Sequence, residues 1–408
     1  MKRYVFFTNS IRNMGGAQMY LRNKMLFLKE HGWYPSVYFF NEGSILIPEL
    51  KEYEDNRIPE LAYPITAVGH YQRERVINRI INDLRGFDEC VFESHIYPQC
   101  YWVEEIAKRL KGRNLLYILH ESFPKYNSKE EAFLKFKYER GEFMNRTQSI
   151  ESLIGKHWVK KTQFIMPSYS NVTSPVDYTI DYDRSIKTIL SIGRLDKPYI
   201  MPMLKEVVTF TERTKQRVNL FFVGGAAEDS FVNSIKEYLK DKSFVIPYYF
   251  GYMFPVPEKL IKSCNVAIAS AGSVLVPAEQ GVPTISIDTQ DYKAIGIYGE
   301  TTDNIYFRSE EKSVNTSDLL YEVLIENKYS NIVAKPSKST LESEKIMNEH
   351  LGIIESLKAP REYYDVFSVF NTKEVLKQKM FMMFYKLMGE SGVQKLVKVR
   401  NFFKEINN

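Results

Sequence analysis

Hydrophobic and polar positions along the first half of the chain alternate between two patterns. Short apolar runs of the kind that buried strands require lie between longer stretches with helical spacing. The first run is followed by a loop with Gly15 and Gly16 and by a helical stretch over 17–31, which Gly32 can end. This order predicts parallel strands joined by crossover helices. The predicted strands are 4–8, 36–40, 90–93, 115–119 and 164–167.

A second alternation of the same kind begins at Lys187. It follows a loop from Asn171 that is rich in Asp, Pro, Ser and Thr, as linkers are. A length of 408 residues also favours two domains over one core. We therefore expect an α/β fold with two Rossmann-like domains, 1–175 and 185–335, facing a central cleft, and C-terminal helices over 336–408. The predicted strands of the second half are 187–192, 218–223, 245–250, 266–270 and 284–287.

The composition supports two packed cores in a reducing compartment. Hydrophobic residues make up 44% of the chain and aromatic residues 14%, which excludes a disordered chain. Cys90, Cys100 and Cys264 lack the spacing of a zinc site, so we expect buried thiols and a cytoplasmic protein. The apolar runs are too short for a signal peptide or a membrane span. Membrane contact is therefore expected to be peripheral.

The charge of the chain is concentrated in its tail. Residues 371–408 carry eight basic and three acidic side chains, which accounts for the whole net charge of +5. The remainder is close to neutral, and this argues against a nucleic-acid surface on the two domains.

The tail also contains an amphipathic stretch over 373–388. Two interpretations stay open for it. With the lysines of 373–404 it lies on an anionic membrane surface on the inner face of the plasma membrane, or its apolar face packs on the first domain. The apolar face consists of Val375, Leu376, Met380, Met383, Phe384 and Leu387.

The glycine loop after the first strand is the earliest candidate site. Gly15 and Gly16 allow a ligand to approach the backbone closely, and the N-terminus of the following helix attracts anions. The loop lacks the G-x-G-x-x-G spacing of dinucleotide sites. We expect it to hold a phosphate or a sugar hydroxyl; the alternative is a tight turn without a ligand.

The run GGAQMYLRNKMLFLKEHGW, which begins at Gly15, resembles the opening loop and helix of GT-B glycosyltransferases of the family 4 type. The chain has Gln18 where that family commonly has Glu. The resemblance implies a metal-independent hexosyl- or N-acetylhexosaminyltransferase that uses a nucleotide-sugar donor, a UDP-sugar above all, and no cofactor. It also implies a glycan or lipid-linked acceptor in bacterial surface polysaccharide biosynthesis, such as capsule assembly.

Two histidines, His95 and His120, follow predicted strands of the first half. Side chains at the carboxyl ends of parallel strands are well placed for hydrogen bonds to sugar hydroxyls or for proton transfer. The segment around His120 resembles the strand-terminal histidine of the family, which lies near the donor sugar, so the resemblance implies a catalytic role for His120. The alternative for both is a ring held by a loop carbonyl.

The segment LSIGRLDKPYI places Gly193, Arg194 and Lys197 directly after a predicted strand. It resembles the family pattern in which Arg and Lys neutralise the donor diphosphate. Fixed cations stabilise the negative charge that a leaving nucleoside diphosphate gains in the transition state. The family spaces its Lys further along, which keeps Lys205 as a rival, and a surface pair without a ligand is the other alternative.

Two further loops resemble the nucleotide site of the family. NLFFVGGAAED, with Gly224, resembles its second glycine signature, which supports the fold more than a site. Tyr252 stands where the family loop contacts the nucleotide base, and an aromatic ring there can stack on the base.

The last motif, NVAIASAGSVLVPAEQGVPTISID, resembles the closing text of the family. The strand is expected to end at Ser270, and the turn with Gly272 and Ser273 to start a helix whose N-terminus binds the diphosphate. The family usually has a glutamate at the position of Val276. Glu279 lies one turn later and is expected to bind the ribose. This departure leaves a retaining or an inverting transfer open.

Two other functions stay open. A nucleotide-sugar epimerase of the same fold needs acid and base carboxylates, and Glu93, Glu121 and Glu279 are the few candidates. A non-catalytic GT-B subunit that supports a partner enzyme would account for the missing glutamate. Asp181 and Asp183 have the D-x-D form of a metal site but stand in the linker, so we expect no bound metal.

Overall fold

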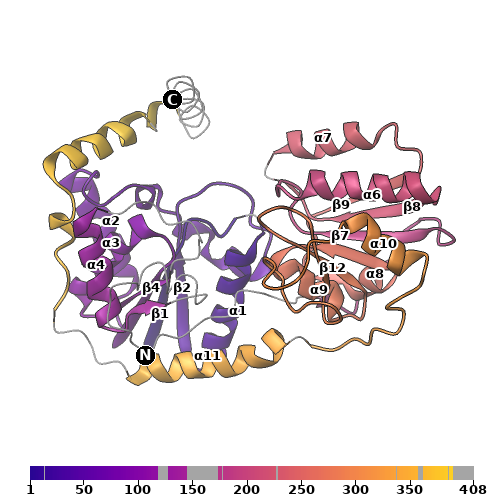
Figure 1. Cartoon of the computed structure of the whole chain (residues 1–408). Helices are drawn as coiled ribbons and strands as arrows, with labels where there is room; N and C mark the ends of the chain where they lie inside the picture. The colour runs from indigo at the N-terminus through magenta and orange to yellow at the C-terminus, as the bar shows by residue number, and fades with distance from the viewer. Residues whose placement is uncertain are drawn as a thin grey trace. The chain divides into compact units, whose positions relative to one another are not determined.

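The computed structural model shows two compact α/β units (Figure 1). The first comprises Met1–Arg12, Leu21–Met166 and Ile346–Asn408, and the second comprises Asn13–Tyr20 and Pro167–Lys345. Each unit is built on one main sheet, and the predicted fold class, α/β with two Rossmann-like units, is confirmed. The structure describes residues 1–12, 14–117, 127–144, 173–176, 178–226, 228–336, 338–356, 362–384 and 386–388.

The sheet of the first unit has the strand order β2-β1-β3-β4-β5, and every neighbouring pair is parallel. The chain order reverses at β1, so the switch point lies at the carboxyl ends of β1 and β3. The strands are β1 (Lys2–Phe7), β2 (Trp33–Tyr38), β3 (Glu89–Ser94), β4 (Arg113–Tyr117) and β5 (Phe143–Met144). The helices are α1 (Gly16–Glu30), whose first residues to Tyr20 are grouped with the second unit, α2 (His70–Asp83), α3 (Tyr97–Leu110) and α4 (Ser128–Glu139), with 3-10 turns η1 (Pro48–Asn56) and η2 (Pro59–Ala62).

Strand β1 is buried on both faces, which explains its continuous apolar run. Val5 and Phe7 belong to the core cluster that also holds buried residues of α2 and α3. Tyr4 points to the opposite face, where the ammonium of Lys24 from α1 lies 4.7 Å from its ring centroid. Successive side chains of a strand point to opposite faces, so helices must cover both sides of this sheet.

The sheet of the second unit has the order β13-β12-β11-β7-β8-β9, and only the β12–β13 pair is antiparallel. Its switch point lies between β7 and β11. The strands are β7 (Lys187–Ile192), β8 (Val218–Val223), β9 (Val245–Gly251), β11 (Val266–Ala269), β12 (Thr284–Ile287) and β13 (Ala294–Ile297); a separate small pair joins β6 (Thr173–Ser174) to β10 (Val256–Pro257). The helices are α6 (Ile200–Thr214), α7 (Asp229–Leu239), α8 (Glu258–Lys262), α9 (Leu275–Ala278) and α10 (Thr316–Leu324), with the 3-10 turn η3 (Ala271–Val274).

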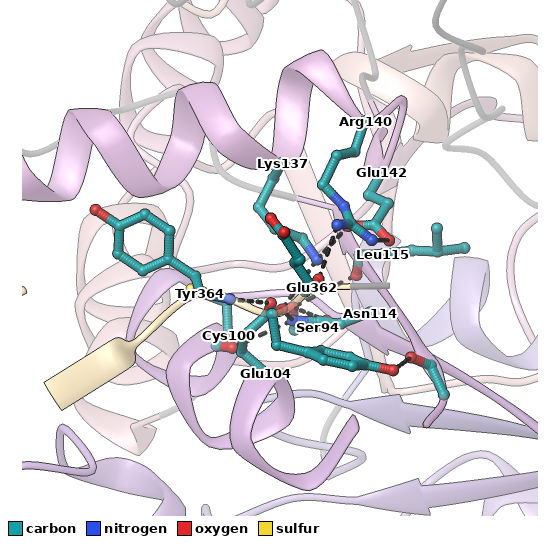
Figure 2. A network of polar contacts seen from close by, with 12 residues as sticks. Ser94, Cys100, Glu104, Asn114, Leu115, Lys137, Arg140, Glu142, Glu362 and Tyr364 are labelled. Atoms are coloured by element: carbon teal, nitrogen blue, oxygen red, sulfur yellow. Dashed lines mark hydrogen bonds and ion pairs between the residues drawn. The ribbon is translucent and has the colours of Figure 1, made fainter. Parts of the chain in front are cut away.

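A buried ionic network crosses the first unit beside β4 (Figure 2). The Nζ atom of Lys137 in α4 lies 3.0 Å from a carboxylate oxygen of Glu104 in α3 and 2.7 Å from one of Glu142. The Asn114 side-chain amide donates to the same Glu104 oxygen at 2.9 Å. All three charged side chains are almost completely buried, so each depends on the others for its charge to be tolerated.

The C-terminal segment joins the first unit through this network. Helix α11 (Lys338–Ser356) and the 3-10 turn η4 (Val366–Ser368) precede a helix over 372–384. The backbone N–H of Tyr364 donates to Glu104 at 3.1 Å, and the Arg140 guanidinium donates to the carbonyl of Glu362 at 2.8 Å (Figure 2). The segment before the last helix is therefore held by the buried Glu104 of α3 and by Arg140, which directly follows α4.

The predicted strands agree with the observed ones to within a few residues wherever the structure describes them. Strands 218–223 and 284–287 have the predicted bounds, and the predicted helix 17–31 is α1. Strand β4 starts two residues before the predicted one. The predicted strand 164–167 lies outside the described residues.

Candidate functional site

The candidate site in the second unit is formed by loops that follow four strands. Gly193 follows β7, Gly224 follows β8, Tyr252 follows β9 and Ser270 follows β11. These strands are parallel, so their carboxyl ends lie at one edge of the sheet. That edge, at the switch point of an open α/β sheet, is where such folds bind ligands.

Two glycines bring the loops after β7 and β8 into direct backbone contact. Gly193 has φ of +136° and Gly224 has φ of +146°, conformations that other residues rarely adopt. A Cβ atom on Gly224 would lie 1.9 Å from the carbonyl oxygen of Gly193. Both glycines are therefore required by the local packing, whatever ligand the loops hold.

The ring of Tyr252 lies against the same loops. A Cβ atom on Gly225 would lie 2.3 Å from this ring, so the ring rests on the glycine backbone. Burial, followed by the carboxylate of Asp196, raises the pKa of Tyr252, and Arg194 opposes the shift. Tyr252, Arg194 and Asp196 thus lie close enough for their charges to interact.

Arg194 is oriented by a neighbour that sequence reasoning missed. Its Nε atom lies 3.1 Å from Oδ1 of Asp196, whose side chain is 12% exposed, while the Arg194 side chain is 43% exposed. Its two Nη atoms make no other ion pair or hydrogen bond within the described part of the chain. The ion pair lies at Nε, so the two-pronged end of this half-exposed side chain, the geometry that binds phosphate, is not used by Asp196.

The two candidate lysines occupy different positions. Lys197 is exposed in the loop that leads into α6, and its backbone N–H donates to the carbonyl of Arg194 at 3.4 Å. Lys205 is exposed on α6 itself. Lys197 is therefore in the same loop as Arg194, whereas Lys205 belongs to the helix that follows.

The loop after β11 differs from the predicted helix start. The 3-10 turn η3 begins at Ala271, which has φ of +56°, and the four-residue α9 follows it. The Ser270 hydroxyl is buried and donates to the carbonyl of Ile287 at 2.9 Å, so it links β11 to β12. Gly272 and Ser273 lie within η3, and the Ser273 hydroxyl oxygen lies 3.5 Å from the Cβ position of Gly193. Ser273 is thus the serine that reaches the loop after β7.

Glu279 directly follows α9. Its backbone N–H donates to the carbonyl of Leu275 at 2.9 Å. Burial, Asp303 and Glu279 together raise the pKa of Tyr298, which places the Glu279 carboxylate near that phenol.

The predicted site residues of the first half are described only in part. Gly15 precedes α1 and its carbonyl accepts the backbone N–H of Met19 at 3.0 Å, while Gly16 is the first residue of α1. His120 and Glu121 lie outside the described residues.

His95 directly follows β3 and is buried. Its Nε2 atom lies 2.8 Å from Oε1 of Glu93, so this ring nitrogen is paired with a carboxylate. The other oxygen of Glu93 accepts the Tyr4 hydroxyl at 2.5 Å and is paired with the ammonium of Lys24. Burial alone would raise the pKa of Glu93, but Lys24 and His95 hold it well below its usual range.

Two further features of the described residues bear on the site. They contain no group of three His, Cys, Asp or Glu side chains arranged to hold a metal ion. A hollow of about 520 Å³ opens at the amino-terminal edge of the first sheet, with Arg3, Trp33 and Tyr53 in its wall. The ligand edge of a parallel sheet is the opposite one, so this hollow is not part of the candidate site.

Sequence comparison leaves the chain without a match. No family model and no curated protein sequence matches it.

Solved structures resemble the chain over most of its length. Anabaena HepE, crystallised with UDP and glucose, has a TM-score of 0.59 at 12% identity and covers 88% of this chain and 100% of its own. A glycosyltransferase from Rickettsia africae has a TM-score of 0.57 at 12% identity over 95% and 99% of the two chains. The pneumococcal O-GlcNAc transferase GtfA, crystallised with UDP and GlcNAc, has 0.53 at 8% over 87% and 99%. These likenesses show the fold: two Rossmann-like units of the GT-B type.

Proposed function

We propose that the protein is a glycosyltransferase that moves a sugar from a UDP-sugar to a glycan or lipid-linked acceptor in bacterial surface polysaccharide biosynthesis. The observation that carries the proposal is the Arg194 guanidinium, which is ion-paired at Nε with Asp196 and has no partner at its Nη atoms among the described residues. This cation lies at the strand edge where GT-B-like sheets bind ligands. The motif around it also resembles that of family 4 transferases.

In this proposal Arg194 and Lys197 bind the donor diphosphate. Charge builds on the leaving UDP as its bond to the sugar breaks, and fixed cations lower the energy of that state. The backbone of Gly193 and the hydroxyl of Ser273 approach each other at the same loop and offer polar contacts to the phosphates. Because these cations supply the neutralising charge, we propose that transfer needs no metal ion.

The nucleoside is assigned to the neighbouring loop. The Tyr252 ring, supported by Gly225, is proposed to stack on the base, and Glu279 is proposed to bind the ribose. UDP is proposed because HepE and GtfA were crystallised with UDP and a sugar. The transferred sugar is accordingly proposed to be a hexose or an N-acetylhexosamine.

The acceptor side and the setting stay proposals from the sequence. We propose that His120, with Gly15 and Gly16, contacts the reacting sugar and the acceptor. We also propose that the domains are 1–175 and 185–335, followed by the C-terminal helices over 336–408. The three cysteines are free and buried, which suits the proposed cytoplasmic setting. Within the described residues, no helix has the length and apolar content to cross a bilayer.

Titration calorimetry with UDP tests the donor site. Arg194→Ala removes the charge-assisted hydrogen bonds to the diphosphate, so the UDP affinity should fall by about 10- to 100-fold. The matched control is Arg213→Ala, because Arg213 is 44% exposed and paired with Asp318 in the same unit. The control should bind UDP as the unmodified protein does. Equal UDP affinity in all three proteins would reject the proposed site.

The epimerase interpretation loses support from the first unit. One of its few candidate carboxylates, Glu93, is completely buried and engaged by Lys24, Tyr4 and His95. An epimerase base needs access to the sugar carbon from which it takes a proton. A measurement of UDP release distinguishes a transferase from a non-catalytic subunit. A transferase releases UDP from a UDP-sugar when acceptor is present, and a binding subunit does not.

A further inference from the structure

The last helix of the first unit, over 372–388, has two unlike faces. Its described residues are 372–384 and 386–388. Asn371 and Glu374 form reciprocal side-chain-to-backbone hydrogen bonds of 3.0 and 2.9 Å at its start, as a capping box does. The helix therefore has a defined beginning, and the direction of each later side chain follows from helical spacing.

One face of this helix is attached to the first unit. Glu374 accepts from the side chain of Asn127 at 3.4 Å, and Gln378 pairs with Thr66 at 2.8 Å. Met382 packs against the core of the unit. These three helix residues are spaced four apart and form one stripe, so the orientation of the helix on the unit is determined.

The opposite face is apolar and exposed. Seven large apolar side chains on the helix are between 43% and 75% exposed. A soluble helix normally turns such residues inward and its polar residues outward. Here the attached stripe includes Glu374 and Gln378, and the seven exposed apolar residues lie outside that stripe. The exposed residues are Leu376, Met380, Phe381, Met383, Phe384, Leu387 and Met388.

The charges of the helix are sorted in the same way. Lys373, Lys377 and Lys379 are exposed outside the attached stripe, whereas Lys386, four residues after Met382, has its ammonium 6.0 Å from the ring centroid of Tyr63 in the first unit. The single acidic residue of 372–388 is Glu374, which belongs to the attached stripe. The outward face thus combines apolar side chains with basic ones and carries no carboxylate within 372–388. Apolar residues flanked by lysines complement the surface of a bilayer with anionic headgroups.

The helix is joined to a rigid part of the unit. The preceding residues Glu362 and Tyr364 are hydrogen-bonded to Arg140 and Glu104 of the buried network (Figure 2). A helix mounted in this way transfers its own orientation to the whole first unit. A flexible tether would not do so.

We infer that the helix over 372–388 binds the first unit to an anionic lipid bilayer, with Met380 and Phe384 entering the headgroup layer and Lys373, Lys377 and Lys379 contacting anionic headgroups. Only the role of this binding rests on the proposed function: it would hold the enzyme at the membrane in which a lipid-linked acceptor is embedded. The binding itself is independent of sugar transfer.

The test is flotation of the full chain with vesicles of phosphatidylcholine alone or with phosphatidylglycerol added, without donor or acceptor. Binding should require phosphatidylglycerol and weaken as salt is raised. Lys377→Gln with Lys379→Gln should lower the affinity by about 25-fold, since each lysine near an anionic surface contributes about fivefold. Met380→Asp with Phe384→Asp should lower it by at least about 100-fold, because both side chains return to water.

The matched control is Phe231→Asp with Leu341→Asp. Both are exposed apolar residues on other helices, at 43% and 68%, so they test whether any exposed apolar pair has the same effect. This control should bind vesicles as the unmodified chain does. UDP calorimetry on every variant shows whether the second unit is intact, so failure of membrane binding and failure of the donor site are read separately.

Two results would overturn the inference. Equal flotation of the Met380→Asp, Phe384→Asp variant and the unmodified chain would remove the helix from the membrane contact. Light scattering that shows a dimer, dissolved by the same two substitutions, together with no flotation, would assign the apolar face to a second copy of this chain.

Discussion

The two units place their charged side chains in different positions. In the first unit, Lys24, Glu93, Glu104 and Lys137 are all buried and paired inside the fold. In the second unit, Asp288 is the one buried charged side chain among the described residues, 3.5 Å from Arg308, and Arg194 stands half-exposed at a strand end. Charges in the first unit are therefore used mainly to hold elements together, whereas those at the edge of the second remain accessible to a ligand.

This difference shows that a polar residue at a strand end is not by itself evidence of a site. Glu93 and His95 stand at the end of β3 in the first unit, as Arg194 stands after β7 in the second. The first two satisfy each other at 2.8 Å in the interior. Arg194 is only partly satisfied, by Asp196, and its Nη atoms have no partner among the described residues. What remains unpaired and exposed decides between structure and binding.

The largest expected effect comes from breaking a buried pair in the first unit. Lys137→Met should lower the free energy of unfolding by about 3–5 kcal/mol, because Glu104 and Glu142 lose the cation that compensates their burial. Urea unfolding followed by tryptophan fluorescence measures it, since all three tryptophans lie within residues 1–166.

The control for this change is Lys135→Met on the same helix. Lys135 is 52% exposed and 3.7 Å from Glu139, so its loss should change stability by no more than about 1 kcal/mol. Adding Glu104→Leu to Lys137→Met should restore part of the lost stability. If Lys137→Met and Lys135→Met lowered the free energy of unfolding by similar amounts, the buried network would not be a special source of stability in the first unit.

The next effect concerns the strand-end loops of the second unit. Gly224→Ala should destabilise that unit by about 3 kcal/mol, because the new methyl group would strike the carbonyl oxygen of Gly193 and φ is +146°. Gly299→Ala is the control, since Gly299 has φ of +78° but no atom within 4 Å of its Cβ position. Hydrogen exchange measured by mass spectrometry should show the difference in 187–297. Equal exchange in the two variants would contradict the close contact.

The smallest expected effect is the change in the free energy of unfolding as the pH is lowered. The pKa of Glu93 and of Glu104 is lowered in spite of burial, by Lys24 and by Lys137 respectively. The stability that these carboxylates contribute is therefore present above about pH 4.5 and lost as the pH falls, by about 1.4 kcal/mol per carboxylate and pH unit. Tryptophan fluorescence should thus detect unfolding of the first unit at a higher pH than exchange detects it in the second. In the second unit, Asp291 is 42% exposed and Glu311 is half-buried, so solvent weakens the interactions that lower their pKa values more than it does for Glu93 and Glu104. If the two units unfolded at the same pH, the proposed difference between their buried charges would be contradicted.

The sequence by itself determined the elements and the place of the candidate loops. Apolar runs buried on both faces read as parallel strands, and β8 and β12 have the predicted bounds. Since parallel strands share one carboxyl edge, residues such as Gly193, Gly224 and Tyr252 could be assigned to that edge before any contact was known.

The tertiary structure alone decided which polar residues are paired inside the fold and which are accessible to a ligand. Lys24 and Glu93 are 69 residues apart, and Glu104 meets the backbone of Tyr364 260 residues later, so no local pattern relates them. The ion pair between Arg194 and Asp196 could not be predicted from their separation of two residues, because such a pair depends on the conformation of the loop between them. The same holds for the last helix: its amphipathic period was visible, but the direction of its apolar face depends on which stripe the first unit binds.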